Sequence, residues 1–157
     1  MNNTLRLFVS IIVCELAGIV GSVFTASAIP NWYATLVSPA LNPPGWLFGP
    51  VWTMLYALMG IALFLVWKKG LAHMGVRKAL SVFGLQLFLN AIWSIVFFGL
   101  QSPAWAFANI VALWVAIAWT MILFYRLSRP AMWLLAPYIA WVSFAGYLNY
   151  CIWMLNS

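Results

Sequence analysis

Residues 78–100 read KALSVFGLQLFLNAIWSIVFFGL, and this stretch decides the class of the fold. After Lys78 it contains no charged residue, and its polar side chains are few. About 20 consecutive, mostly apolar residues are enough for an α-helix to cross a bilayer. The strict apolar–polar alternation of a membrane β-barrel strand is absent. The stretch therefore predicts a transmembrane helix.

Four further stretches have the same character, at 5–27, 46–68, 104–126 and 131–154. Basic residues, glycines and prolines separate the stretches, and such residues punctuate helices. We therefore predict an all-α fold, an integral membrane bundle of five transmembrane helices, with residues 1–157 as a single domain. A long loop at 28–45 joins the first two helices.

The composition excludes a water-soluble globular protein. Of the 157 residues, 67% are hydrophobic and 5% charged, and the mean hydropathy is +1.04. Soluble domains contain about 25% charged residues. The net charge of +6 reflects the scarcity of acids, since seven basic residues face a single acid. The lipid bilayer is therefore an expected partner, and a nucleic acid is not.

The basic residues also predict an orientation. Basic connections of membrane proteins face the cytoplasm, so in a bacterial plasma membrane the N-terminus is cytoplasmic and the C-terminus lies outside. An alternative is that residues 1–28 form a cleaved signal peptide ending in Ala26-Ser27-Ala28, although Glu15 interrupts the apolar run. Five spans place all seven basic residues on one side of the membrane: Arg6, Lys68, Lys69, Arg77, Lys78, Arg126 and Arg129.

The loop at 28–45 reads AIPNWYATLVSPALNPPG and is rich in proline and aromatic residues. A long loop with its own apolar residues is typical of a functional element. We predict a structured lid with one short helical turn around 31–37. The alternative is a loose loop that anchors Trp32 and Tyr33 among the lipid headgroups.

The chain offers few groups for covalent or metal chemistry. One histidine, His73, one acid and two cysteines far apart along their helices, Cys14 and Cys151, predict neither a metal site nor a disulfide. Paired carboxylates and a catalytic triad are excluded for the same reason. The sequence therefore predicts no metal and no required cofactor.

Polar and aromatic residues at helical spacing predict a binding face inside the bundle. On the third helix Gln86, Asn90, Trp93 and Phe97 are separated by four, three and four positions. Together with eleven Trp and eleven Phe, this face suits a large flat ligand that stacks on aromatic rings. The alternative is core packing and interfacial belts. The other helices contribute Trp52, Tyr56, Met59, Trp105, Asn109, Trp141, Ala145 and Asn149.

Two features of the first helix allow more than one interpretation. Glu15 and Gln86 fall at a similar depth in the membrane, which predicts a hydrogen bond between a protonated Glu15 and Gln86. The alternative is that Glu15 is a functional proton site. The small residues Ala17 and Gly21 allow close approach of another helix. That helix belongs either to a second copy in a homodimer or to the same protomer.

Three blocks of residues resemble a known family. The first block runs from Trp32-Tyr33 to Tyr56 and includes Pro39, Asn42-Pro43-Pro44, Trp46 and Pro50-x-Trp52. The second block is Gln86-x3-Asn90-x2-Trp93-x3-Phe97-Phe98. The third block is Pro137-Tyr138-x2-Trp141-x3-Ala145-x2-Leu148-Asn149-Tyr150. In this order they are similar to the TspO/MBR family, the tryptophan-rich sensory and translocator proteins, also called the peripheral benzodiazepine receptor family.

The resemblance implies a five-helix bundle, often dimeric, that binds porphyrins or haem and benzodiazepine-type drugs under a lid. It also implies a link to light- or oxygen-dependent porphyrin breakdown, with Trp52 and Trp141 as the matching indoles. Whether that chemistry is enzymatic is left open. The functional alternatives are binding and sensing, sequestration, and proton-coupled transport of an amphipathic solute. The expected ligand-binding residues are Trp32, Tyr33, Pro43, Pro44, Trp52, Tyr56, Asn90, Trp93, Trp105, Asn109, Trp141, Ala145 and Leu148.

The chain departs from the family pattern in three places. Ser38 stands where a Lys is common and Leu41 where a Trp is common, so the lid lacks a cation that could meet a propionate. No basic residue follows Tyr150, although the cholesterol motif proposed for the family's animal members requires one. Cholesterol binding is therefore not expected.

Overall fold

The structure, a computed structural model, describes all residues from Met1 to Ser157. It is all-helical, and five segments are long and apolar enough to cross a membrane, as the sequence predicts. They cover Asn3–Ala28, Gly45–Trp67, Met74–Gly99, Pro103–Leu127 and Arg129–Leu155. Within them lie α1 (Asn3–Ala28), α2 (Phe48–Trp67), α3 (Met74–Ser94), α4 (Pro103–Leu127), α5 (Arg129–Leu134) and α6 (Ala136–Leu155).

The helices begin where short polar side chains can cap them. The Asn2 side chain accepts a hydrogen bond from the Leu5 amide at 2.8 Å, and His73 Nδ1 accepts one from the Gly75 amide at 3.0 Å. Ser102 and Ser128 cap α4 and α5, each followed at once or one residue later by a proline. Such residues satisfy amides that have no partner within the helix. The short connections therefore fix the ends of the spans.

Two spans are less regular than the sequence suggests. The fifth is interrupted at Leu135, between α5 and α6, close to Pro137, which lacks a backbone donor. The third ends in a π-helical segment, η3 (Ile95–Gly99), where the Leu100 amide reaches back to the Ile95 carbonyl at 2.8 Å. Gln101 then adopts a left-handed φ of 54°. The π turn buries both Phe97 and Phe98.

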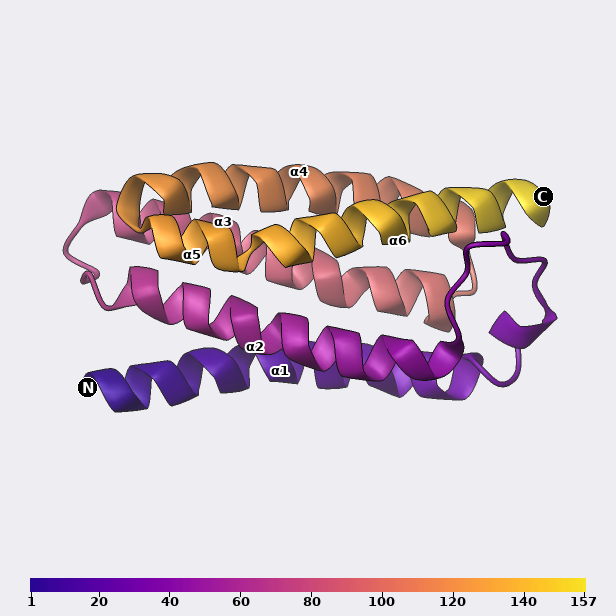
Figure 1. Cartoon of the computed structure of the whole chain (residues 1–157), viewed down its shortest axis with the longest axis horizontal. Helices are drawn as coiled ribbons and strands as arrows, with labels where there is room; N and C mark the ends of the chain where they lie inside the picture. Colours follow the sequence, from indigo (N-terminus) through magenta and orange to yellow (C-terminus); the bar gives the residue numbers. More distant parts are fainter.

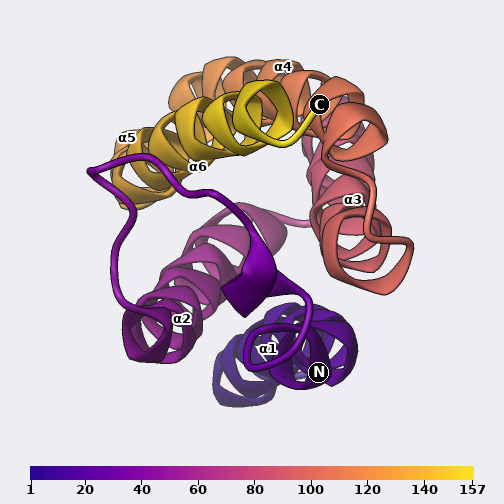
Figure 2. The ribbon, with the colours of Figure 1, turned by 90° about the vertical axis from the view of Figure 1, so that its right-hand side faces the viewer.

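The five spans form a ring (Figure 2). Around it, α1 contacts α2 and α3, α4 packs between α3 and the α5–α6 segment, and α2 completes the ring mainly through α5. The N-terminus and the connections after α2 and α4 lie at one end, whereas the loop after α1 and the C-terminus lie at the other (Figure 1). Because α2 meets α5 more closely than α6, the ring is tight at the first end and wider at the second.

The small residues of α1 and α2 allow close packing within the protomer. A Cβ atom on Gly60 would lie 2.5 Å from Ile11 Cα, and one on Gly21 would lie 2.9 Å from Ser94 Oγ. Gly18 faces the ring of Tyr56. Of the two interpretations of the small residues of α1, the structure therefore supports packing inside the protomer.

The loop between α1 and α2 is a structured lid. The predicted turn is present as the 3-10 helix η1 (Tyr33–Thr35), and a second, η2 (Gly45–Leu47), leads into α2. Tyr33 is buried, and its hydroxyl donates to Asn42 Oδ1 at 2.8 Å. Trp32 packs edge-on against Phe97, with ring centroids 5.6 Å apart. The alternative, in which Trp32 and Tyr33 anchor at headgroups, is wrong because both rings pack on the bundle.

The C-terminus is also bonded to the lid. Asn156 Oδ1 accepts a hydrogen bond from the Val37 amide at 3.0 Å, and its Nδ2 donates to the Val37 carbonyl at 2.9 Å. One side-chain amide thus pairs with both backbone groups of a lid residue, as a neighbouring strand would. The lid is fastened at Tyr33 and again at Val37.

Candidate functional site

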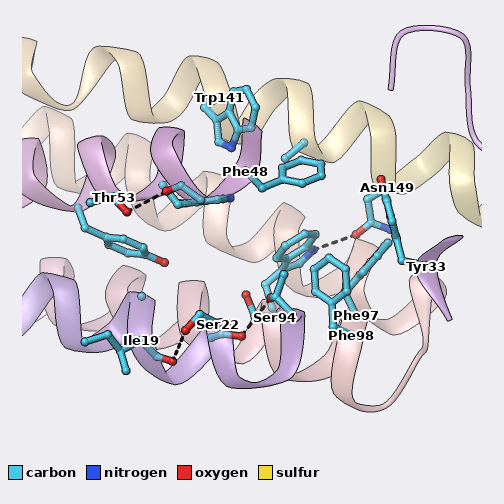
Figure 3. A pocket seen from close by; sticks show the side chains of 18 of the residues that line it. Ile19, Ser22, Tyr33, Phe48, Thr53, Ser94, Phe97, Phe98, Trp141 and Asn149 are labelled. Carbon is cyan, nitrogen blue, oxygen red and sulfur yellow. Dashed lines mark hydrogen bonds between the residues drawn. The ribbon is translucent and has the colours of Figure 1, made fainter. Parts of the chain in front are cut away.

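A cavity of about 470 Å³ lies beneath the lid, in the wide half of the ring. Its walls come from α1, α2, the end of α3 and α6, and Tyr33 of the lid contributes as well. Figure 3 shows Trp141 and Phe48 on one side and Ile19 and Ser22 on the opposite side. Cavities of a few hundred cubic ångströms with mostly apolar walls are typical of small-molecule sites.

Seven of the predicted ligand-binding residues line this cavity. They come from four separate segments, so the helical stripes do converge in space. The seven are Tyr33, Trp52, Tyr56, Trp93, Trp141, Ala145 and Leu148.

The other six predicted residues lie outside the cavity lining: Trp32, Pro43, Pro44, Asn90, Trp105 and Asn109. Trp105 is 75% exposed, and Asn109 Nδ2 donates to the Leu89 carbonyl at 3.0 Å, which ties α4 to α3. No residue of α4 reaches the cavity, because α4 packs against α3 and α6 on the side away from α1.

Asn90 belongs instead to a buried chain of hydrogen bonds. Tyr56 donates its hydroxyl to Asn90 Oδ1, and Asn90 Nδ2 donates to the Tyr138 hydroxyl at 2.8 Å. Tyr138 in turn donates to Gln86 Oε1 at 2.7 Å, and Gln86 Nε2 lies 3.9 Å from Met59 Sδ. Buried polar groups require such partners. This chain joins α2, α3 and α6 behind the cavity wall.

The predicted hydrogen bond between Glu15 and Gln86 is therefore wrong. Both polar ends of the Gln86 amide are engaged by Tyr138 and Met59. Glu15 lines the cavity from α1 and makes no hydrogen bond or ion pair with the protein. The error arose because depth along two helices does not determine which faces meet.

A second polar connection lies nearer the lid. Trp93 Nε1 donates to Asn149 Oδ1 at 2.9 Å, and Asn149 Nδ2 donates to the Pro103 carbonyl at 2.8 Å. This connection links α3, α6 and the start of α4. Trp93 therefore presents its ring to the cavity with its only polar atom already engaged.

The aromatic wall of the cavity has a defined geometry. Trp52 stacks on Tyr56, with ring centroids 5.6 Å apart, and stands perpendicular to Trp141 at 6.5 Å. Phe48 meets Trp141 edge-on at 6.3 Å. Trp141 Nε1 is buried and has no hydrogen-bond partner. A ligand acceptor that reached this nitrogen would supply the missing partner.

The only ionisable side chain in the cavity that can carry a charge near neutral pH is an acid. Glu15 is the single acid of the chain and lines the cavity, whereas no Lys, Arg or His does. At the lid, burial raises the pKa of the Tyr33 phenol, and its hydrogen bond with Asn42 partly offsets this effect. Nowhere do three His, Cys, Asp or Glu side chains gather as a metal site would require.

The sequence reasoning did not place α1 in the site. Six residues of α1 line the cavity, and four of them, Glu15, Gly18, Ser22 and Thr25, are spaced by three, four and three positions. That spacing is one helical face. This stripe of small and polar residues in an apolar span is the available signal for a cavity wall on α1. Of the four residues, only Glu15 is singled out from the sequence, as a hydrogen-bonding or proton site.

Five apolar spans around an aromatic cavity under a fastened lid define an α-helical, multi-pass membrane protein with a ligand-sized internal site. A profile of the TspO/MBR family matches residues 10–154, and the chain belongs to this family. The resemblance seen in the three sequence blocks is thereby confirmed.

Individual relatives agree with this assignment. The chain is similar to a tryptophan-rich protein TspO of Chlorobaculum tepidum, at 48% identity over 97% of this chain and 96% of the relative. A TspO protein of Archaeoglobus fulgidus is 43% identical over 99% of both chains. The translocator protein of Homo sapiens is 41% identical over 87% of this chain and 82% of its own length.

Proposed function

We propose that this protein binds flat, largely apolar ligands, porphyrins and benzodiazepine-type molecules among them, in the cavity beneath the lid, and acts as a membrane binding and sensing protein. The observation that carries the proposal is the cavity of about 470 Å³ walled by Trp52, Trp93 and Trp141. Indole faces stack on conjugated rings. The uncommitted Trp141 N–H adds one donor for a ligand acceptor.

A cavity-filling variant tests this proposal. Ala145 lines the cavity and is buried, whereas Ala140 lies on the same helix and is exposed. We expect Ala145→Phe to abolish saturable protoporphyrin IX binding, because the new ring occupies ligand space. Ala140→Phe is the matched control and is expected to bind as the original protein does.

The titration is performed in the dark, in nanodiscs, and followed by the porphyrin's own absorbance. Saturable binding that Ala145→Phe removes and Ala140→Phe retains supports the proposal. Binding that does not saturate, or that Ala145→Phe leaves intact, refutes it, since it would reflect partition into lipid.

A second candidate function is light-dependent breakdown of bound porphyrin by dioxygen. It is favoured by the perpendicular pair of Trp52 and Trp141, whose ring centroids lie 6.5 Å apart on the cavity wall. Illumination in air is expected to yield a product with a shifted absorbance band, and Trp52→Phe or Trp141→Phe to suppress it. A product that forms equally in both variants would exclude this function.

We also propose the orientation and assembly that the sequence predicts. All seven basic residues lie at the end opposite the lid, which favours a cytoplasmic position for that end and an external lid. Protease accessibility of a tag on either terminus tests this orientation. A homodimer stays a prediction, and crosslinking in membranes at low protein density tests it.

A further inference from the structure

Glu15 lies near the middle of α1, where a bilayer is least tolerant of charge. Along the helix axis it lies about 18 Å from Asn3, the first residue of α1, at a rise of about 1.5 Å per residue. Its side chain lines the cavity, and no hydrogen bond or ion pair connects it to the protein. An ionisable residue inside a membrane span is costly and marks a functional site whose partner has to be identified.

Four hydroxyl groups that line the cavity with Glu15 donate their protons to other groups. The Tyr56 hydroxyl donates to Asn90, and Ser22 donates to the Ile19 carbonyl at 2.8 Å. Thr25 and Thr53 likewise donate to carbonyls of their own helices. These hydroxyls line the cavity with Glu15, but their protons are committed elsewhere.

No basic side chain of the protein forms an ion pair with Glu15 either. The residues that line the cavity include no Lys, Arg or His, and the basic residues gather at the opposite end of the bundle. The cavity therefore carries one acidic group, unmatched by any protein charge, among mostly aromatic and apolar residues and a few uncharged polar ones.

The rings near Glu15 are of the kind that attracts a cation. Gly18, one turn after Glu15 on the same face of α1, lies against the Tyr56 ring. Trp52 stacks on that ring with its centroid 5.6 Å away. A cation over an indole or phenol face is attracted by the ring's electron density. An acid beside stacked aromatic rings offers an organic ammonium or iminium group both a charge partner and a ring face.

We infer that the cavity takes amphipathic aromatic cations, whose single positive charge pairs with Glu15 while the flat apolar body lies against Trp52 and Trp141. This inference rests on the proposed function, because it uses the same cavity, and it adds the charge class of the ligand. An anionic porphyrin in this site directs its carboxylates away from Glu15, toward the lid.

The test compares N-methylacridinium with acridine, two rings of matched shape that differ in a permanent charge. Both are titrated against the full chain in nanodiscs of zwitterionic phospholipid, so that lipid charge does not attract the cation. We expect the protein to bind N-methylacridinium at least ten-fold more tightly than acridine. Glu15→Gln is expected to lower the affinity for N-methylacridinium about ten-fold or more and so remove this preference, and Glu15→Asp is expected to restore part of it.

The outcomes separate this inference from the proposed function. Protoporphyrin IX binding that saturates and is blocked by Ala145→Phe, together with equal affinity for both acridines, overturns the charge inference alone. Failure of all three ligands to saturate overturns both. If Glu15→Gln fails to fold, loss of preference in Glu15→Ala with retained acridine binding supports the inference, and retained preference overturns it.

Discussion

The buried hydrogen-bond chain behind the cavity makes a quantitative prediction for Tyr138→Phe. Tyr138 is fully buried, and its hydroxyl accepts from Asn90 and donates to Gln86. Removing that one oxygen leaves two buried polar groups without a partner while the ring stays in place. Hydrogen bonds between membrane helices contribute about 0.6 kcal/mol on average and about 1.7 at most. Two of them predict a loss of about 1–3 kcal/mol in the free energy of unfolding.

The assay is reversible unfolding in mixed micelles, followed by far-UV circular dichroism. Tyr150→Phe is the matched control, because Tyr150 lies on the same helix, is 46% exposed and makes no side-chain hydrogen bond. We expect that control to change stability by less than about 0.5 kcal/mol, as is usual for surface substitutions. Equal stability of Tyr138→Phe and Tyr150→Phe would refute the reasoning that these two hydrogen bonds hold α6 to α3.

Two further predictions concern the close approach at α1 and the lid. Gly18→Ala places a Cβ 2.5 Å from Tyr56 Cε2, so overpacking should lower the free energy of unfolding by about 1–3 kcal/mol. Gly49→Ala is the control and should leave stability unchanged, because its Cβ would meet nothing within 4 Å. Equal effects of the two substitutions would contradict this account. Asn156→Ala removes both hydrogen bonds to Val37. The Val37 amide should then exchange its hydrogen with solvent at least about fivefold faster, which corresponds to a loss of about 1 kcal/mol. An unchanged exchange rate would show that the Asn156 side chain does not hold the lid.

The five spans could be predicted from sequence because their determinants are local. Each is a run of apolar residues ended by capping serines, prolines or basic residues, so the predicted and observed bounds differ by a few residues. The π turn at Ile95–Gly99 could not be predicted, since it depends on how Phe97 and Phe98 pack beneath the lid.

The candidate site was predictable only in part, for a physical reason. Helical spacing put Asn90 on the same face as Trp93, and that face does point inward. Whether an inward residue meets a cavity or a partner depends on side chains distant in sequence, and here Tyr56 and Tyr138 engage the Asn90 amide. The part of the cavity wall that α1 forms is not predictable from the helix alone. Its small residues leave space beside the helix, and only the neighbouring helices of the assembled bundle determine whether that space is filled.

The most direct test of a ligand site beneath the lid is a titration of protoporphyrin IX followed by the indole N–H resonances of ¹⁵N-tryptophan-labelled protein. Signals are assigned by single Trp→Phe variants. We expect the Trp52 and Trp141 resonances to shift saturably, while those of Trp105 and Trp133, which are 75% and 66% exposed, stay in place. Shifts that do not saturate and spread evenly over all eleven indoles would contradict the account.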